Sequence, residues 1–354
     1  MSPKKENQKK EFKLEDLDGI GKVRADKLRA SGITTLFDLL IRGSQELSVI
    51  TEMDRDACTR LIEKAKIELR STGDLPQASI KDLSSHKQDI LKLKTGSEEV
   101  DNMLGGYDFE GNQLPGGIET QAITEIYGQE GAGKTQFGLT LSAMTLGAGH
   151  GVFFIDCEGT FDEGRFMDIC KARKINPDMS KFLYMKALDT DTIMLSVDSF
   201  IKDIIENGVK LIYIDGAIGK FRAEFDQGRG DLNVRQNRLK PFFLHLSKMA
   251  DYLNVAVVVT NQVMGNPDPY SGESMKAVGG YIVGHAPKYI LWFKKNTKNK
   301  RTITFKKSNR HAMYDIVIYL NKEGISDTEE YKEKKVDDDE DISEEPPVNE
   351  LDEK

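Results

Sequence analysis

Apolar and polar positions follow two different periods along the chain, and the change of period separates two parts. Between residues 13 and 70 the apolar positions recur at helical spacing, which predicts amphipathic helices. From residue 93 onwards, short β-branched and aromatic runs alternate with longer segments of helical period. Strands that alternate with helices predict a parallel sheet with helices on its faces. We therefore expect a small all-α domain over 13–70, a linker over 71–92 and an α/β core over 93–325.

Five apolar runs in the core have the length and composition of buried strands. Helical segments at 192–205 and 232–252 separate some of these strands, as expected for a doubly wound parallel sheet. Two later runs, 302–305 and 315–320, are predicted as antiparallel additions at the sheet edge. The five buried runs are 123–127, 152–156, 211–215, 255–260 and 289–293.

The two ends of the chain are too polar to pack into either part. Residues 1–12 are rich in lysine and lack the apolar core of a signal peptide. Residues 326–354 contain 14 acidic residues and four lysines, a net charge of −10. We expect both ends to be disordered. Because the whole chain carries −8, the rest carries +2, so the acidic total does not argue against a nucleic-acid partner.

The composition and the cysteines indicate the cellular compartment in which the protein is expected to act. The chain is 38% hydrophobic, which is enough for a sizeable core, but it has no apolar run long enough to span a bilayer. Cys58, Cys157 and Cys170 are odd in number and lack metal-ligand spacing. This usage indicates a reducing compartment, so we expect a cytoplasmic protein without a membrane partner.

The most specific motif is the segment 128–135, which reads GQEGAGKT and fits the phosphate-binding P-loop pattern. A predicted strand precedes it, and a helix-forming segment follows it. Backbone N–H groups and the positive end of the helix favour a phosphate there. Lys134 is expected to reach the β- and γ-phosphates of ATP, and the Thr135 hydroxyl to bind Mg²⁺. The residues predicted to hold the nucleotide are Gly128, Gln129, Glu130, Gly131, Ala132, Gly133, Lys134, Thr135 and Gln136.

Polar residues stand at the ends of three predicted buried strands, where α/β sheets bind ligands. Asp215 is placed to hold Mg²⁺ directly or through water; a helix cap is the alternative. Glu158 is the candidate base for the water that attacks ATP, with Asp156 as its competitor and capping as the plain alternative. Gln262 is expected to sense the γ-phosphate and to relay its state to the next loop, unless it is an ordinary strand-end glutamine.

Two long loops near these strand ends are rich in glycine and basic residues. One spans 220–231 and includes Arg222 and Arg229, with Arg235 on the helix that follows. The other spans 264–283 and includes Lys276. Long loops between core elements are often functional, and this composition suits a nucleic-acid channel. Solvated surface loops are the alternative.

The helical domain contains a second candidate DNA contact. The segment 14–28 predicts a short helix, a Gly-Ile-Gly turn and a second helix, as in a helix-hairpin-helix module. Backbone N–H groups at such a turn, here at Gly19 and Gly21, bind a DNA phosphate without reading sequence. Lys22 and Arg24 lie beside the turn. A helical bundle with a glycine turn and no ligand is the alternative.

Together these motifs resemble the RecA-type recombinases, most closely the archaeal RadA branch and its eukaryotic relatives. They occur in the family's order, and the N-terminal helical module is also typical of this branch. The segments that carry the resemblance are 95–97, 104–106, 117–125, 133–136, 156–161, 221–224, 228–230, 235–236 and 258–263, with Gly279, Gly280, His285 and Ala286.

The resemblance implies an ATPase that assembles as a helical filament on single-stranded DNA. It further implies pairing with double-stranded DNA, strand exchange, DNA-stimulated hydrolysis of ATP, and contact with recombination mediators; rings off DNA remain open. Glu158, Lys134 and Gln262 take the catalytic positions, and Arg165 matches the family arginine that stacks on adenine. His285 matches a residue that links the nucleotide to DNA. Arg222, Arg229 and Arg235 match the first DNA loop, and the segment 263–283 matches the second.

Four positions depart from the family pattern, and three of them support an alternative function. Gly216 stands where a serine is usual, Glu130 brings a carboxylate to the phosphates, and Leu75 replaces the phenylalanine of the segment that docks one subunit on the next. Lys307 stands where relatives place a cation-binding aspartate over the neighbour's nucleotide. The changes at Gly216, Glu130 and Leu75 favour a recombinase paralogue or mediator with weak strand exchange. The Lys307 ammonium is instead expected to replace a bound cation at the γ-phosphate, which makes activity less dependent on potassium or calcium. A helicase-like or clock-like relative lacks support from the N-terminal module.

Overall fold

The computed structural model describes most of the chain in six ranges. These ranges are 14–73, 75, 90–225, 231–265, 275–308 and 314–329. The expected disordered N-terminus and residues 330–354 of the tail lie outside the described residues, as do Arg229 and the linker over 76–89. Among the described residues, no helix combines the length and apolar character needed to cross a membrane.

A small helical domain forms the N-terminal part. Its first described element is a 3-10 turn rather than the expected short helix, and Gly19 turns the chain after it with a φ of 104°. Thr35 and Asp38 form a reciprocal capping box at the start of α2, which satisfies N–H groups that the helix leaves open. The elements are η1 (Leu14–Asp16), α1 (Lys22–Ala30), α2 (Leu36–Arg42), α3 (Ser44–Thr51) and α4 (Arg55–Ser71).

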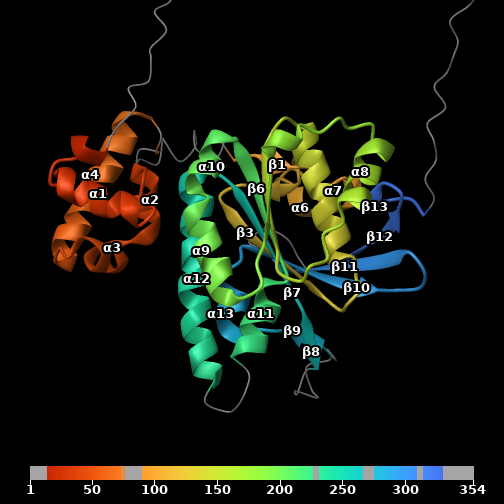
Figure 1. Cartoon of the computed structure of the whole chain (residues 1–354). Helices are drawn as coiled ribbons and strands as arrows, with labels where there is room; N and C mark the ends of the chain where they lie inside the picture. The colour runs from red at the N-terminus through yellow and green to blue at the C-terminus, as the bar shows by residue number, and fades with distance from the viewer. Residues whose placement is uncertain are drawn as a thin grey trace, which may run out of the picture.

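The core is built on a nine-stranded sheet with the order β13-β12-β11-β10-β3-β7-β6-β4-β5 (Figure 1). The six strands from β10 to β5 are parallel, whereas β11, β12 and β13 add in antiparallel fashion. This confirms the expected mostly parallel sheet with antiparallel edge strands. The strands are β3 (Ala122–Gly128), β4 (Gly151–Asp156), β5 (Phe182–Lys186), β6 (Val209–Asp215), β7 (Ala256–Asn261), β10 (Tyr289–Lys295), β11 (Lys300–Lys307), β12 (Asp315–Asn321) and β13 (Gly324–Ser326).

Helices cover both faces of this sheet. The single helix expected over 192–205 is divided into two, α9 and α10, at Phe200. Two short ribbons accompany the main sheet: β1 (Lys92–Leu93) with β2 (Ile118–Glu119), and β8 (Val263–Gly265) with β9 (Met275–Ala277). The helices are α6 (Glu98–Gly105), α7 (Lys134–Gly147), α8 (Glu163–Ala172), α9 (Thr190–Ser199), α10 (Ile201–Glu206), α11 (Ala217–Glu224), α12 (Asp231–Leu253) and α13 (Gly280–His285), with the 3-10 turn η2 (Met179–Lys181).

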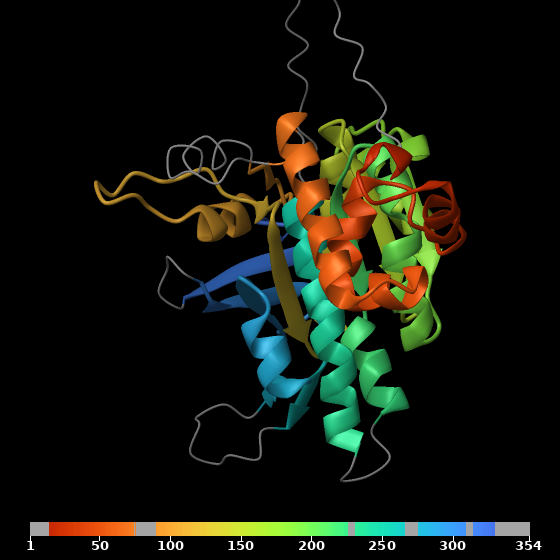
Figure 2. The same cartoon turned by 90° about the vertical axis from the view of Figure 1, so that its left-hand side faces the viewer.

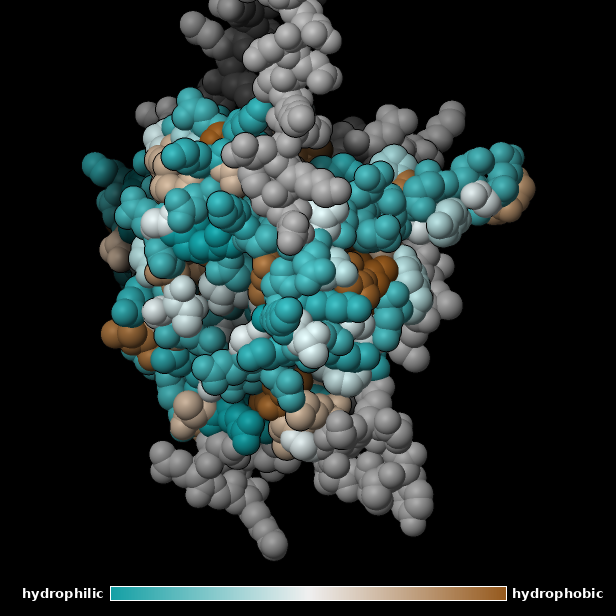
Figure 3. All heavy atoms as spheres, turned by 90° about the vertical axis from the view of Figure 1, so that its right-hand side faces the viewer, coloured by the Kyte–Doolittle hydropathy of each residue, from teal (hydrophilic) through white to brown (hydrophobic). Residues whose placement is uncertain are grey.

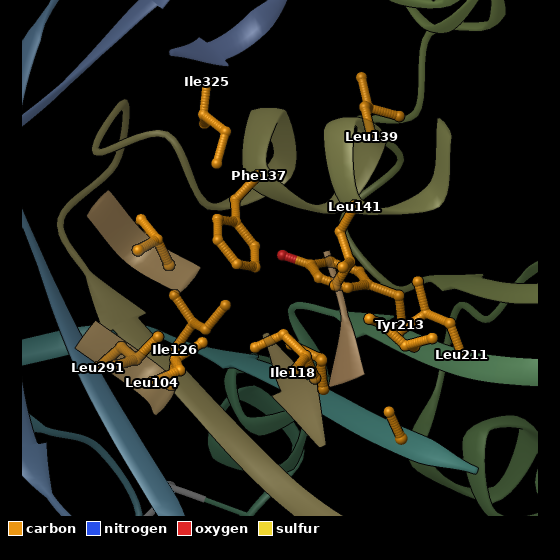
Figure 4. Close-up of a cluster of buried hydrophobic side chains, with 14 of the residues drawn as sticks. Leu104, Ile118, Ile126, Phe137, Leu139, Leu141, Leu211, Tyr213, Leu291 and Ile325 are labelled. Atoms are coloured by element: carbon orange, nitrogen blue, oxygen red, sulfur yellow. The ribbon is translucent and has the colours of Figure 1, made fainter. Parts of the chain in front are cut away.

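Two apolar layers fix the sheet between these helices. On one face, Phe137 of α7 packs with Tyr213 and Leu291 of the sheet (Figure 4). On the other face, Phe242 and Leu246 of α12 pack against β6 and β7. Because both faces are covered, the central strands are mostly apolar. Thr124 and Glu125 are buried polar exceptions within β3, and most other polar groups stand near the strand ends, which is where the site lies.

The core extends beyond the boundaries expected from the sequence. Lys92, assigned to the linker, pairs with Glu119 in the β1–β2 ribbon. Ser326, assigned to the tail, ends β13. The next residue, Asp327, accepts hydrogen bonds from the Ser97 hydroxyl and from the Glu98 backbone N–H, at 2.7 Å for the latter. Tertiary contacts therefore fix polar residues that composition alone assigns to disordered chain.

The helical domain packs on the core through α2 and α12. The Lys248 ammonium of α12 donates to the Ile41 carbonyl at the end of α2, at 2.8 Å. Phe37 and Tyr252 add apolar contacts to both domains. The two domains therefore share one apolar interface.

Candidate active site

The P-loop lies between β3 and α7, as its motif requires. Gly131 and Gly133 have φ values of 70° and 101°, a conformation that favours glycine. The Lys134 ammonium turns back on the loop and donates to the carbonyls of Gly128 and Gln129, at 3.0 and 3.1 Å. The lysine is thus held at the mouth of a hollow of about 1060 Å³, which we call the P-loop hollow.

Burial and nearby carboxylates have opposite effects on the pKa of Lys134 in this hollow. Desolvation lowers the pKa of Lys134, while Glu158 and Asp215 oppose that shift. The Lys134 carbonyl also accepts a hydrogen bond from the Tyr213 hydroxyl, at 2.7 Å, which ties α7 to β6. A buried ammonium beside an open hollow, at the start of helix α7, is suited to binding a phosphate.

Asp215 lies at the end of β6 and faces the P-loop. Its carboxylate accepts hydrogen bonds from the Thr135 and Thr260 hydroxyls, both at 2.6 Å, and the Thr160 hydroxyl approaches to 3.4 Å. Burial raises the pKa of Asp215, and the two close hydroxyls act against that shift. A carboxylate and hydroxyls form a hard, all-oxygen ligand set, which is the type that Mg²⁺ prefers.

The two acidic residues that follow β4 have different surroundings. Asp156 is buried, and its oxygens accept the backbone N–H groups of residues 158, 159, 160 and 161 at 2.7–3.2 Å. It therefore anchors the loop and has little capacity left for a water. Glu158 is exposed and lines the P-loop hollow. This geometry favours Glu158 over Asp156 as the group that meets a reacting water.

Gln262 joins the P-loop hollow to the second candidate DNA loop. Its amide donates to a Glu158 carboxylate oxygen at 3.1 Å. Its backbone carbonyl accepts the Val278 N–H, also at 3.1 Å, beyond the β8–β9 ribbon. Lys276 lies on β9 of that ribbon. The side chain of Gln262 therefore lies at the hollow, and its backbone lies one residue before the loop begins. A displacement of the side chain acts close to the base of the loop.

Of the other site residues predicted from the sequence, some lie at the P-loop hollow and some lie in other parts of the chain. Arg222 of α11 lines the P-loop hollow. Arg165 donates to the Gln136 side chain at 2.8 Å and to the Asn321 and Lys322 carbonyls, so it flanks the loop. Lys22 follows the Gly19 turn in the helical domain. Arg235 lies on α12 outside the residues that line the hollow.

Lys307 lies outside the P-loop hollow of its own chain. Its ammonium donates to the carbonyls of Gly284, His285 and Pro287, at 3.1, 2.9 and 2.7 Å. These groups form the C-terminal end of α13, where a cation is favoured. Lys307 thus ties the antiparallel strand β11 to the helix that follows the second loop.

The departures from the family pattern have structural consequences. Gly216 has a φ of 86°, and a Cβ placed there would lie 2.3 Å from Cγ of Glu158. The glycine therefore leaves room for the Glu158 side chain. Leu75 is 8% exposed and packs against its own helical domain, so the proposed docking residue is turned inward. Glu130 is exposed at the mouth of the hollow.

Several residues at the site had not been identified from the sequence. Thr160 and Thr260 contact Asp215, and the polar end of the 255–260 strand was the available signal for Thr260. Arg301 of β11 donates to the Gly131 carbonyl at 3.1 Å. No sequence pattern indicates that contact, because it depends on the packing of β11 beside β10 and of β10 beside β3.

Comparison with known proteins agrees with this geometry. Residues 86–328 match the Rad51 family. The chain is 37% identical over 330 residues to the "DNA repair and recombination protein RadA" of Cenarchaeum symbiosum, which covers 90% of this chain and 80% of that protein. It is 32% identical over 330 residues to the protein of the same name from Aeropyrum pernix, with 91% and 99% covered. The chain therefore belongs to the Rad51 family, on the side of its archaeal RadA-type members.

Proposed function

We propose that this protein is an ATP-dependent recombinase that acts in DNA repair and homologous recombination. It assembles on single-stranded DNA as a filament, pairs that strand with double-stranded DNA and exchanges strands while hydrolysing ATP. The contact between Glu158 and Gln262, at 3.1 Å on the wall of the P-loop hollow, carries the proposal. It joins a candidate base to the candidate DNA loop. An ATPase controlled by DNA needs such a connection.

ATP is the substrate, and its phosphates bind along the P-loop with Lys134 beside the γ-phosphate. Thr135 and Asp215 would hold Mg²⁺, which neutralises phosphate charge when bound. Glu158 orients a water and accepts its proton as the oxygen bonds to the γ-phosphorus and the bond to ADP breaks. Asp156 keeps the Glu158 loop in place through its four backbone hydrogen bonds.

DNA controls this step through Gln262. Binding of DNA at the β8–β9 ribbon, near Lys276, shifts the backbone of Val278, which donates to the Gln262 carbonyl. Gln262 then changes the position of Glu158 relative to the attacking water. Arg222, which lines the P-loop hollow, brings the first DNA loop into the same relay. Gly19, Gly21 and Lys22 add a contact to DNA that does not depend on sequence.

The decisive experiment measures ATP hydrolysis with and without single-stranded DNA for wild type and Glu158→Gln. We expect DNA to stimulate wild type, and the variant to lose about a hundredfold or more in kcat, the usual contribution of a general base. Glu163→Gln, an exposed acidic residue on α8, is the matched control and should hydrolyse ATP normally. Equal rates for the two variants would reject Glu158 as the base.

The mediator alternative is favoured by the inward position of Leu75, since a leucine packed in its own domain is not available to dock on a neighbouring subunit. Weak hydrolysis that DNA does not change would support it.

Lys307 provides a further test, through the cation dependence of ATP hydrolysis. We propose that its ammonium, at the end of α13, takes the place of a bound cation near a neighbour's γ-phosphate. Hydrolysis should then vary little when potassium is titrated, and a strong potassium requirement would contradict that role.

A further inference from the structure

One carboxyl group lies within a central strand of the sheet, away from the surface where charged side chains normally stand. Figure 3 shows a face of the molecule that is mostly hydrophilic, as expected when charged groups remain in water. Glu125 of β3 is an exception, because its side chain is fully buried. A buried carboxyl group costs free energy unless it is paired or hydrogen-bonded. The partners of Glu125 therefore indicate why it is there.

The hydrogen bond that Glu125 accepts comes from the end of the neighbouring strand. The Asn261 amide donates to one oxygen of its carboxyl group at 2.7 Å. Among the described residues, the second oxygen has no hydrogen-bond partner. Desolvation raises the pKa of Glu125 to about 8, although the Asn261 amide and the Lys307 ammonium act against that shift. The carboxyl group is therefore protonated at pH 7, so the Asn261 amide is held by a neutral acceptor.

Asn261 uses the whole of its side-chain amide at the end of β7. Its Nδ2 donates to the Glu125 carboxyl group and to the Val278 carbonyl, at 2.7 Å each. Its Oδ1 accepts the Gln262 backbone N–H, also at 2.7 Å. A side-chain amide has two N–H groups, so both donors of Asn261 are used. Because Asn261 is fully buried, bulk water cannot replace a partner that moves away.

Val278 is bonded to this strand end through both of its backbone groups. Its N–H donates to the Gln262 carbonyl at 3.1 Å, and its own carbonyl accepts from Asn261. Val278 directly follows β9, and the β8–β9 ribbon and α13 lie together at the lower edge of the core in Figure 2. A movement of the second candidate DNA loop therefore reaches both Asn261 and Gln262.

Glu125 supplies the fixed end of this connection. It stands on β3, which lies between β7 and β10 in the middle of the sheet. With the Asn261 amide held on Glu125, a shift of Val278 has to be passed on to the backbone of Gln262 or has to break a buried hydrogen bond. Without that acceptor, the Asn261 side chain can rotate with Val278 and absorb the shift. Rigid elements joined by hydrogen bonds transmit a displacement that a free side chain does not.

We propose that Glu125 and Asn261 are positioning residues that transmit the state of the second candidate DNA loop to Gln262. Gln262 passes the displacement to Glu158, because its side-chain amide donates to Glu158 at 3.1 Å. This role rests on the proposed function and deepens it, since it concerns the control of ATP hydrolysis by DNA. Glu125 and Asn261 act from outside the set of described residues that line the P-loop hollow.

The test compares ATP hydrolysis with and without single-stranded DNA and uses the ratio of the two kcat values. Glu125→Leu removes the acceptor and should lower this ratio at least about fivefold, the lower end of the usual coupling between two sites. Glu125→Gln keeps an oxygen that accepts from Asn261, so it should retain the wild-type ratio. A role in folding alone would lower both rates of Glu125→Leu together and leave the ratio unchanged. That result would overturn the proposal.

Two further variants guard against a general effect of changes in the core. Asn261→Ser replaces Glu125→Leu if the latter does not fold. A serine has one hydroxyl donor, so it cannot serve both Glu125 and Val278, and the ratio should again fall. Thr124→Val is the matched control, because Thr124 is buried beside Glu125 and its hydroxyl has no hydrogen-bond partner within the described part of the chain. An equal loss in Thr124→Val would contradict a specific role of the pair.

The double variant shows whether the two residues act through one connection. Glu125→Leu combined with Asn261→Ser should lower the ratio no further than the more affected single variant, because both changes break the same path. Losses that multiply would refute the pairing. A wild type that DNA does not stimulate would overturn the proposed function together with this role. Stimulation of wild type with an unchanged ratio in the variants would overturn this role only, so the two failures are distinguishable.

Discussion

Gly216 is the residue whose replacement has the most direct consequence for the P-loop hollow. A Cβ at this position would lie 2.3 Å from Cγ of Glu158, and the backbone φ of 86° is strained for other residues. We therefore expect Gly216→Ser to displace Glu158 and to lower kcat by about a hundredfold, the usual cost of misplacing a catalytic group by about 1 Å. Steady-state hydrolysis of ATP measures the change.

A matched glycine separates displacement of Glu158 from backbone strain. Gly208 also has a positive φ, 58°, but a Cβ there meets no atom within 4 Å. Gly208→Ser should cost stability without lowering kcat. If both substitutions lower kcat equally, the effect of Gly216→Ser comes from strain rather than from contact with Glu158.

Glu125 gives the molecule a pH-dependent stability. It is fully buried on β3, accepts from the Asn261 amide at 2.7 Å, and burial raises its pKa to about 8. The folded protein therefore keeps a proton on Glu125 that the unfolded chain releases near 4.5. As the pH rises from about 5 to about 8, the free energy of unfolding of wild type should fall relative to Glu125→Gln. Urea unfolding at several pH values measures this difference, and parallel pH profiles would contradict it.

At the scale of elements, the end of β13 determines how α6 begins. Asp327 accepts from the Ser97 hydroxyl and the Glu98 N–H, so it caps α6 from a distant part of the chain. Asp327→Ala should lower the free energy of unfolding by about 1 kcal/mol, the usual loss for a helix cap. Urea unfolding measures it, with Glu329→Ala as the nearby acidic control. Equal effects of the two variants would show that capping is not the cause.

The elements differ in how well the sequence indicates them. The strands over 152–156 and 211–215 are predicted by apolar runs that end in an acidic residue, and the strand over 123–127 by its alternating, β-branched pattern. The edge strand β5 was not predicted, because its burial is only partial and its sequence mixes apolar with polar residues. Likewise α9 and α10 share one helical pattern, and at the break between them the Phe200 ring stacks on Phe153, with 4.7 Å between ring centroids.

At the scale of the whole molecule, charge is unevenly distributed, and we expect the acidic C-terminal end to compete with DNA for the basic residues of the candidate DNA loops. The segment 326–354 carries −10, while the rest of the chain carries +2. Deletion of residues 330–354 should therefore tighten binding of single-stranded DNA roughly tenfold at low salt, and the gain should shrink as salt screens the charges. Fluorescence anisotropy over a salt series measures both effects. Identical affinities at every salt concentration would show that the segment does not compete with DNA.

The sequence by itself determined the type of fold and the chemistry of the P-loop hollow. The period of the apolar positions, the polar residues at the strand ends and the motif over 128–135 are local features of the sequence. They depend on local backbone geometry and on which residue types bind phosphate. The same reasoning named Lys134, Thr135, Asp215 and Glu158, which lie together around the hollow.

Only the tertiary structure decided between residues that local patterns leave equivalent. Asp156 and Glu158 are two positions apart in one loop, but the fold buries Asp156 under four backbone N–H groups and leaves Glu158 open. The fold also turned Leu75 inward and left Phe109 outside. Burial and hydrogen-bond partners come from segments far apart in the chain, so no local pattern records them.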